Sequence, residues 1–463
     1  MQYSTFAAID IGSYDVILEI FEISKKQGIR SVDKICHRME LGKDTYTLGK
    51  IRPEMEEELC RVLADFVRIM EGYRVDDYRA TASSAISEAS NSLYVLGKIH
   101  QLTGLSVTVL SNSEQRFLSY KALAAMEDNF NKIIEKGTAI LDLDGGSFQI
   151  SLFDKDALVT TQNIRMGSLR IRERLAGIQS ETEHYEEMVE ELIWNEVSSF
   201  KKMYLKDRKI ENIMLIGDVF TDSVYQNIEE KTTKIISCEN FNTWYEKIIR
   251  QSPMELAVKL GIPLENASLM YPSAVIYKCL IDMMGAEHIW IPGVHMTRGI
   301  AYEYAEQMKL LKGGHNFEND ILMAAKNIGK RYAVNRPHVQ NLEMTALAIF
   351  DATKKMHGMK ERERLLLQMA VMLHDVGKYI SFNNVADSSY NIIMSNEIIG
   401  LSHIEREMVA LIARYNTVTL PSYDELVMES SLSAEQYLTV SELTAIVRLA
   451  NALDRSHLQK IQS

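Results

Sequence analysis

The chain has 463 residues, 46% of them hydrophobic, and carries 51 Lys and Arg against 63 Asp and Glu, a net charge of −12. This length predicts several domains, and the negative charge argues against a general surface for nucleic acid or an anionic membrane. No apolar run reaches membrane-spanning length and the first residues lack a secretory pattern, so we expect a cytoplasmic protein. The scattered cysteines predict buried, reduced thiols, namely Cys36, Cys60, Cys238 and Cys279.

The first predicted element is a β-hairpin over residues 6–23. An apolar β run ends at Asp10, a tight turn follows, and a second β run returns. Glycine permits the sharp turn and lets backbone N–H groups approach an anion, while serine adds a hydroxyl donor. We therefore expect Gly12, Ser13 and Tyr14 to bind phosphate.

Strand and helix alternate after this hairpin. Apolar residues at helical spacing predict a helix over 54–71. Short apolar runs predict buried strands over 78–82 and 106–110, and a helix follows through 114–120. The polar segment 128–137 has few apolar residues and predicts the first domain boundary.

A second predicted hairpin, over residues 140–150, repeats the first almost residue for residue. Two such turns facing each other would hold a phosphate chain from both sides, with acidic side chains holding a cation between them. Two ordinary hairpins are the alternative, since Asp-Gly turns are common. Further strands are predicted over 213–217 and 288–291. The expected metal ligands are Asp10, Asp142 and Asp144, and the expected phosphate contacts of the second turn are Gly145, Gly146 and Ser147.

Beyond residue 315 the strand patterns disappear. Long amphipathic stretches predict helices over 343–356 and 361–373, and the pair His374-Asp375 closes the second of these. Neighbouring His and Asp side chains can share a divalent metal if another His and Asp arrive from other helices. A hydrogen-bonded pair at a helix end is the alternative.

Taken together, these motifs resemble those of the exopolyphosphatase and guanosine-pentaphosphate phosphohydrolase family. The phosphate loops of that family read like Asp-Ile-Gly-Ser-Asn-Ser and Asp-Ile-Gly-Gly-Gly-Ser-Thr-Glu, and here they span residues 10–15 and 142–149. The resemblance implies an α/β protein with duplicated ribonuclease H-like domains of the actin and sugar kinase superfamily, followed by an all-α HD-like domain. It implies domains of residues 1–130, 131–312 and 313–463.

The resemblance also implies an activity, namely release of terminal phosphate from polyphosphate or guanosine pentaphosphate with Mg²⁺ or Mn²⁺. The departures from the family fall at this site. The family's Ser-Gly-x-Glu-Glu-Ala-Arg segment supplies a glutamate thought to activate water, and that position is Gln115; the closing Glu of the second loop is Gln149. An amide cannot accept a proton at neutral pH, so each change removes a potential general base. An expected phosphate-binding Arg is Ser87, and an expected glycine-rich loop now contains Asp218.

Three interpretations stay open. In the first, the site is a rebuilt hydrolase in which Glu114 is the base, Asp15 and Asp144 restore acidic groups, and Arg298 contacts phosphate. In the second, the protein is a catalytically silent regulator that binds a phosphate chain or a nucleotide. In the third, it is a sugar or acetate kinase-like phosphotransferase, against which the loss of glycines near Gly217 counts. A homodimer is possible in each case.

The HD-like domain departs from the family in the same direction. A His-His-x-His-Ser stretch of the family is replaced by residues 385–389, which contain no imidazole, and Asn451 stands at an acidic position. His338, His374 and Asp375 remain as candidate ligands, which are too few for a two-metal phosphohydrolase site. We expect no metal in this domain.

Overall fold

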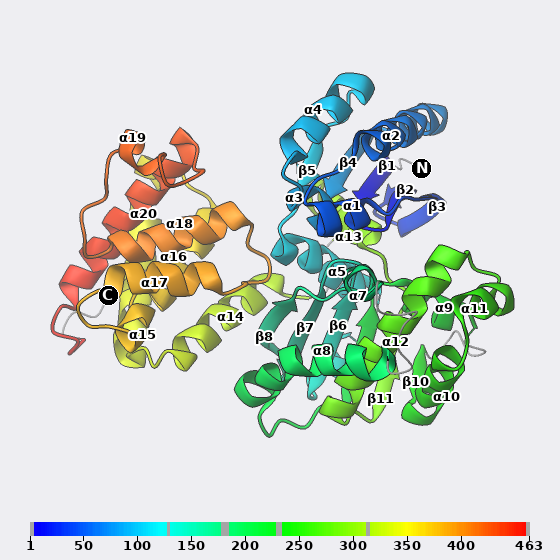
Figure 1. Cartoon of the computed structure of the whole chain (residues 1–463). Helices are drawn as coiled ribbons and strands as arrows, with labels where there is room; N and C mark the ends of the chain where they lie inside the picture. Colours follow the sequence, from blue (N-terminus) through cyan, green and yellow to red (C-terminus); the bar gives the residue numbers. More distant parts are fainter. Residues whose placement is uncertain (1–3, 127–129, 177–184, 228–233, 312–314, 460–463) are drawn as a thin grey trace. The chain divides into compact units, whose positions relative to one another are not determined.

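The computed structural model describes residues 4–126, 130–176, 185–227, 234–311 and 315–459. By contact the chain divides into two compact units: residues 1–157 with 162–315, and residues 158–161 with 316–463. The first unit contains two mixed sheets with their helices, and the second is helical (Figure 1).

The first sheet has the strand order β3-β2-β1-β4-β5. Strands β1, β2 and β3 are antiparallel neighbours, whereas β4 runs parallel to β1 and β5 runs parallel to β4. The predicted first hairpin is thus the pair β1 and β2. The strands are β1 (Ser4–Ile11), β2 (Asp15–Ser24), β3 (Gly28–Arg38), β4 (Asp77–Ala82) and β5 (Val107–Val109).

The second sheet repeats this order as β8-β7-β6-β9-β11 and adds β10 at the edge. Strands β6 and β7 form the predicted second hairpin, and β9 runs parallel to β6. Asp10 and Asp142 hold equivalent positions, each the last but one residue of its central strand. The expected duplication is confirmed. The strands are β6 (Thr138–Leu143), β7 (Phe148–Asp154), β8 (Ala157–Ile164), β9 (Asn212–Ile216), β10 (Ile235–Ser237) and β11 (His288–Trp290).

The helices of the α/β unit are α1 (Leu41–Leu48), α2 (Pro53–Tyr73), α3 (Ser84–Ser87), α4 (Ser92–Thr103), α5 (Asn112–Met126), α6 (Phe130–Ile134), α7 (Ser168–Leu175), α8 (Tyr185–Phe200) with the π-helical turn η1 (Lys201–Leu205), α9 (Val219–Asn227), α10 (Cys238–Ile249), α11 (Pro253–Leu260), α12 (Leu264–Met284) and α13 (Met296–Gln307).

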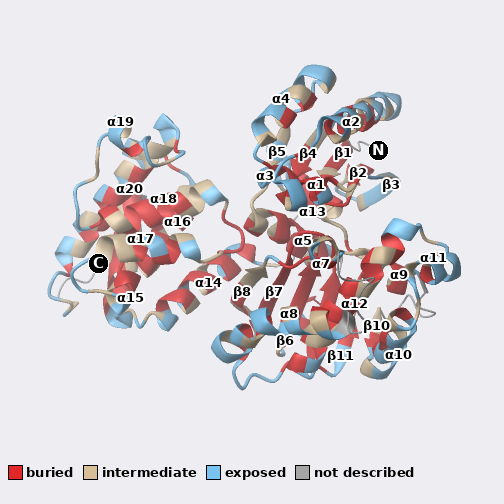
Figure 2. Ribbon diagram, viewed as in Figure 1, coloured by how far each residue is buried: buried red, intermediate tan, exposed pale blue. Residues whose placement is uncertain are grey.

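Strand β1 is buried on both faces, because its side chains alternate between two layers of helices. Ile9 and Ile11 belong to a core that includes α2 and α4. Phe6 and Ala8 point to the other face, where they pack with residues of α5 and α13. The ring of Phe6 stacks on that of Tyr304 at a centroid distance of 4.1 Å. Figure 2 shows the buried strands between helices whose outer faces are exposed.

The second unit is helical, as expected. Helix α16 packs against α14, α15 and α18, and α18 in turn packs against α17 and α20. Among the described residues, no helix has the length and apolarity needed to cross a membrane. The helices are α14 (Phe317–Arg331), α15 (Arg336–His357), α16 (Glu361–Leu373), the 3₁₀ turn η2 (Val376–Tyr379), α17 (Val385–Ser395), α18 (His403–Tyr415), α19 (Tyr423–Leu426) and α20 (Ala434–Leu453).

The cysteines are free, but only Cys60 is fully buried and Cys36 is exposed on β3, so the expectation of four buried thiols was wrong. The predicted domain boundaries after residues 130 and 312 stay predictions, and the second lies at residues outside the described part of the chain.

Candidate functional site

The turns of the two hairpins have matching backbone geometry. The N–H of Gly12 donates to the carbonyl of Asp15, and the N–H of Asp144 donates to the carbonyl of Ser147, both at 2.9 Å. Asp144 therefore stands where the first turn has Gly12. Its φ is not among the positive values in the chain, so this turn position accepts a side chain without strain.

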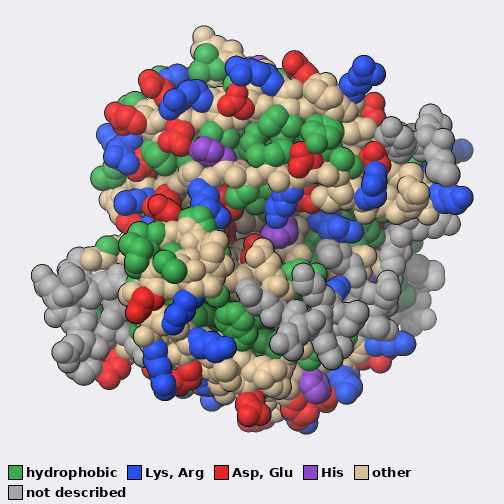
Figure 3. All heavy atoms as spheres, turned by 90° about the vertical axis from the view of Figure 1, so that its right-hand side faces the viewer, with side chains coloured by type: hydrophobic (Ala, Val, Ile, Leu, Met, Phe, Trp, Pro, Cys, Tyr) green, Lys and Arg blue, Asp and Glu red, His purple; other side chains and the backbone are tan. Residues whose placement is uncertain are grey.

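Both turns line a single cavity of about 430 Å³ in the α/β unit. Lys and Arg side chains border the middle of the face drawn in Figure 3, with a histidine among them. The cavity is large enough for a small phosphorylated ligand. The predicted site residues on its wall are Asp10, Gly12, Tyr14, Asp15, Gln115, Asp142, Asp144 and Gly145.

Glu114, the expected base, is not on this wall. Its Oε2 atom accepts hydrogen bonds from the backbone N–H of Ser111 at 2.9 Å and from the hydroxyl of Ser111 at 2.7 Å. These bonds cap the N-terminus of α5, where a carboxylate is favourable. The neighbouring Gln115 does line the cavity, and its Nε2 donates to Oδ2 of Asp144 at 3.1 Å.

Other predicted residues support the turns from behind. The hydroxyl of Ser13 is buried and lies 2.8 Å from the hydroxyl of Tyr46. Gly146 lies against the same tyrosine, since a Cβ there would come within 2.3 Å of its hydroxyl oxygen. Gln149 donates to Ser151 at 3.3 Å. None of these residues lines the cavity, and neither do Arg298 and Ser87. Nη2 of Arg298 instead donates to a backbone carbonyl of β3 at 3.4 Å.

The most important residue that sequence reasoning missed is Arg116. Its guanidinium lies 2.6 Å from Oδ1 of Asp142, and the two side chains are only 3% and 5% exposed. It also donates to the carbonyl and hydroxyl oxygens of Ser147 at 3.3 and 3.2 Å. The family segment quoted above has alanine at this position, so a charged residue in place of a small one was the available signal.

The aspartates of the cavity have perturbed acidity. Burial raises the pKa of Asp10, and the nearby carboxylates of Asp15 and Asp144 raise it further. Burial raises the pKa of Asp15 to about 6, although a bond from the Cys36 thiol opposes it. Burial also raises the pKa of Asp218 to about 7. Two carboxyl groups on the cavity wall therefore titrate close to neutral pH.

The charges around the cavity do not balance. Lys34 and Arg38, on the same side of β3, join Arg116 as the basic residues of the wall. Burial lowers the pKa of His295, so this imidazole adds little positive charge at neutral pH. The acidic residues of the wall are Asp10, Asp15, Asp142, Asp144, Asp218 and Asp222. An anionic ligand therefore needs a further cation or protonated carboxyl groups.

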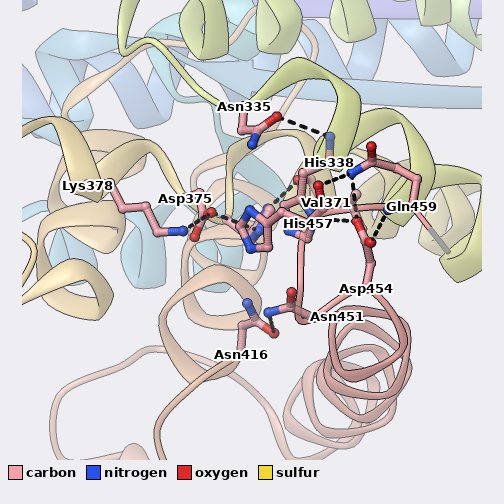
Figure 4. A network of polar contacts seen from close by, with 11 residues as sticks. Asn335, His338, Val371, Asp375, Lys378, Asn416, Asn451, Asp454, His457 and Gln459 are labelled. Atoms are coloured by element: carbon pink, nitrogen blue, oxygen red, sulfur yellow. Dashed lines mark hydrogen bonds and ion pairs between the residues drawn. The ribbon is translucent and has the colours of Figure 1, made fainter.

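The candidate ligands of the helical unit also come together. His338, His374 and Asp375 each offer a ligand atom, and these atoms lie within 4.8 Å of one another. His338 comes from the first turn of α15, and the other two follow the end of α16. Asp454, which the sequence did not single out, lies 2.8 Å from Nδ1 of His338 (Figure 4).

Two sheets with the same strand order, whose equivalent turns line one cavity, define a duplicated α/β fold of the actin and sugar kinase type, here followed by a helical domain. Models of the Ppx/GppA phosphatase family and of its domain III match residues 20–308 and 322–463. The chain belongs to the Ppx/GppA phosphatase family. The first match begins after the turn of the first hairpin.

Curated relatives are distant. The chain is 21% identical over 310 residues to a bifunctional 3-dehydroquinate synthase/phosphatase of Fusobacterium nucleatum, covering 61% of this chain and 44% of that protein. The chain thus spans less than half the length of that relative. It is 18% identical over 449 residues to the guanosine-5'-triphosphate,3'-diphosphate pyrophosphatase of Vibrio atlanticus, covering 96% of this chain and 86% of that protein.

Solved structures support the fold. A Ppx/GppA family member from Aquifex aeolicus superposes with a TM-score of 0.55 and 18% identity, covering 66% of this chain and 99% of that one. An exopolyphosphatase from Cytophaga hutchinsonii superposes with a TM-score of 0.58 and 17% identity, covering 66% of this chain and 98% of that one.

Proposed function

We propose that the cavity between the two hairpin turns hydrolyses terminal phosphoanhydride bonds of inorganic polyphosphate or guanosine pentaphosphate. The observation that carries this proposal is that equivalent turns of both sheets line one cavity, with Asp10 and Asp142 at equivalent places. Membership of a phosphatase family supports the reaction class. Catalysis of this kind consists mainly of positioning and electrostatic stabilisation.

The carboxylates of the cavity suit Mg²⁺ or Mn²⁺. Oδ1 of Asp10 and Oδ2 of Asp142 are buried and have no hydrogen-bond partner in the described part of the chain. With Asp144 they do not converge as a three-ligand group there. Mg²⁺ is usually held by one or two carboxylates together with substrate phosphates, so two free oxygens suffice. When bound, the cation would neutralise charge on the transferred phosphoryl group.

The basic side chains of the wall would share this task. Arg116 is fixed by its ion pair with Asp142 and by its bonds to the second turn. Lys34 and Arg38 are exposed at the cavity wall, where they can contact the distal part of a phosphate chain. Gly12 and Gly145 bring backbone close to the same space.

We assign the general base to Asp15 rather than to Glu114. A base works best when its pKa is near the operating pH, and the pKa of Asp15 is raised to about 6. Asp15 lies on the cavity wall, whereas the carboxylate of Glu114 caps a helix. Gln115 cannot accept a proton, but its amide holds Asp144. Asp15 would take a proton from the water that attacks the terminal phosphorus.

The proposal is tested by phosphate release from long-chain polyphosphate, guanosine pentaphosphate and ATP with Mg²⁺ or Mn²⁺. Asp15→Asn should lower kcat by about 10²–10⁴-fold and remove the rise of kcat/KM through pH 6. Asp65→Asn, at an exposed site on α2, is the matched control and should change neither quantity. Glu114→Gln should leave the pH profile intact.

Absence of turnover with all three substrates, with polyphosphate binding retained, would overturn the hydrolase proposal in favour of a silent binding protein. Equal losses in Asp15→Asn and Glu114→Gln would overturn the assignment of the base. A cytoplasmic location and a homodimer stay predictions that this assay does not address.

A further inference from the structure

A cluster of three hydroxyl groups lies directly behind the two hairpin turns, and it consists of Ser13, Tyr46 and Ser84. The hydroxyl of Tyr46, on α1, lies 2.8 Å from that of Ser13 in the first turn and 2.8 Å from that of Ser84 at the start of α3. The hydroxyls of Ser13 and Ser84 are 3.3 Å apart, so the three oxygens form a triangle. None of these three side chains lines the cavity.

The hydroxyl cluster can satisfy its hydrogen bonds internally. Each hydroxyl has one proton to donate and can accept from a neighbour, so a triangle of hydroxyls has a place for all three protons. Burial raises the pKa of Tyr46 to about 12, and the nearby carboxylate of Asp144 raises it further, so the phenol keeps its proton at neutral pH. The cluster therefore ties the first turn to α1 and α3 by bonds that do not change between mildly acidic and mildly basic pH.

The backbone of the second turn packs directly on this cluster. A Cβ at Gly146 would come within 2.3 Å of the hydroxyl oxygen of Tyr46 and within 2.6 Å of that of Ser84. A Cβ at Gly145 would come within 3.3 Å of the Cβ of Ser13. The absence of a side chain at these two glycines is what lets the second turn approach the first so closely.

Arg170, on α7, holds this contact together. Its Nε donates to the carbonyl oxygen of Gly146 at 2.9 Å, and its Nη2 donates to Glu88 at 3.0 Å. Its guanidinium carbon lies over the ring of Tyr46, 3.9 Å from the ring centre. Gly146 follows the central strand of the second sheet, whereas Tyr46 and Glu88 belong to the half of the α/β unit that contains the first sheet. One side chain thus joins the second turn to two residues of the other half.

The spacing of the turns matters because each follows a strand that carries one carboxylate of the cavity. Oδ1 of Asp10 and Oδ2 of Asp142 are the buried oxygens that would reach Mg²⁺ in the proposed hydrolysis. Mg²⁺ accepts oxygen ligands at about 2.0–2.1 Å in near-ideal octahedral geometry. A misplacement of about 1 Å in an active site can lower a rate about 10²-fold. A small shift of one turn against the other would therefore impair catalysis.

We propose that Tyr46 and Arg170 are positioning residues, which set the spacing of the two hairpin turns for phosphoanhydride hydrolysis without touching the substrate. This role rests on the proposed function of the cavity. Neither side chain lines the cavity, so a change in either one acts on the reaction through the turns.

The role is tested first by steady-state kinetics with polyphosphate and Mg²⁺. Tyr46→Phe removes the hydroxyl but keeps the ring beneath Arg170, and it should lower kcat about 10-fold with KM nearly unchanged. Arg170→Met removes all the contacts of the guanidinium and should lower kcat about 10²-fold. The matched controls are Tyr73→Phe on α2 and Arg364→Met on α16, which each break a polar contact elsewhere and should change neither quantity.

The ratio of kcat with Mn²⁺ to kcat with Mg²⁺ separates altered geometry from loss of folded protein. Mn²⁺ is larger and less strict in its geometry than Mg²⁺, so this ratio should rise in Tyr46→Phe and in Arg170→Met. Partial unfolding would lower both rates by the same factor and leave the ratio unchanged. Adding Ser13→Ala to Tyr46→Phe should cost little beyond the larger single loss, because both changes break the same bond.

Hydrogen exchange, measured by mass spectrometry without substrate or metal, tests the role independently of turnover. The N–H groups of Gly12 and Asp144 are each bonded across their turns. Exchange in peptides covering 10–15 and 142–149 should therefore be faster in Arg170→Met than in wild type, and unchanged in Arg364→Met. Wild-type kcat in both variants, or unchanged exchange in Arg170→Met, would overturn the positioning role. Absence of phosphate release by wild type, together with faster exchange in Arg170→Met, would overturn the proposed hydrolysis and leave the contact as the group that holds the turns.

Discussion

The buried pair of Arg116 and Asp142 permits a quantitative test of the electrostatics of the candidate site. Arg116→Met removes the charge but keeps most of the length of the side chain. The guanidinium and carboxylate are 2.6 Å apart at their nearest atoms and almost fully buried. Two charges about 4 Å apart at an effective dielectric of about 20 attract by about 4 kcal/mol. Loss of one partner of a buried pair typically costs about 3–5 kcal/mol.

We therefore expect the free energy of unfolding, measured in urea at pH 8, to fall by about 3–5 kcal/mol in Arg116→Met. The loss should shrink as the pH falls to 5. Burial already raises the pKa of Asp142, and Arg116 opposes this rise. Without Arg116 the folded-state pKa lies further above the unfolded value, so the folded state binds the extra proton and regains stability on acidification.

Two controls isolate the charge. Arg68→Met breaks an exposed pair, with side chains 76% and 63% exposed, and should cost less than about 1 kcal/mol at either pH. Adding Asp142→Asn to Arg116→Met removes both charges and should restore part of the lost stability. A loss below about 1 kcal/mol at pH 8, or the same loss at pH 5 and pH 8, would refute the reasoning.

Three further substitutions test packing and hydrogen bonding in the α/β unit, and each is measured as a urea unfolding free energy. Gly299→Ala, inside α13, places a Cβ 2.0 Å from the carbonyl oxygen of Leu118 and should cost about 1–3 kcal/mol. Gly97→Ala, inside α4 with open space around it, should instead raise the free energy of unfolding by up to about 1 kcal/mol. Equal effects of the two substitutions would contradict the close contact between Gly299 and Leu118. Tyr14→Phe removes a buried bond to Asn266 at 2.6 Å and should cost about 1–3 kcal/mol; an unchanged midpoint would show that this bond contributes nothing.

The sequence predicted both central hairpins because their apolar runs are long and end at the same Asp and turn pattern. It did not predict β3, β8 or β10. Strand β3 has a largely exposed side with Lys34, Cys36 and Arg38, so its alternation is polar and weak. Strand β10 has only three residues. Such strands are defined by the neighbours that they pair with rather than by their own composition.

The candidate site was predicted in outline and missed in detail. The turn residues that line the cavity could be named because their chemistry is local to each hairpin. Glu114 was chosen as a base because of its type, but its place at the start of α5 makes it a cap. The pairing of Arg116 with Asp142 joins a helix of one half to a strand of the other, and no local pattern records such a contact. The bond from His338 to Asp454 joins residues 116 positions apart, so it too leaves no local pattern in the sequence.

The return of α13 to the first sheet has a consequence for the order of folding. Ile300 and Tyr304 complete the apolar face that begins with Phe6, nearly three hundred residues earlier in the chain. During synthesis this face stays only partly covered until α13 has left the ribosome, and such distant contacts slow folding and leave apolar surface exposed meanwhile. A nascent chain that stalls before α13 would therefore be a natural client for a chaperone.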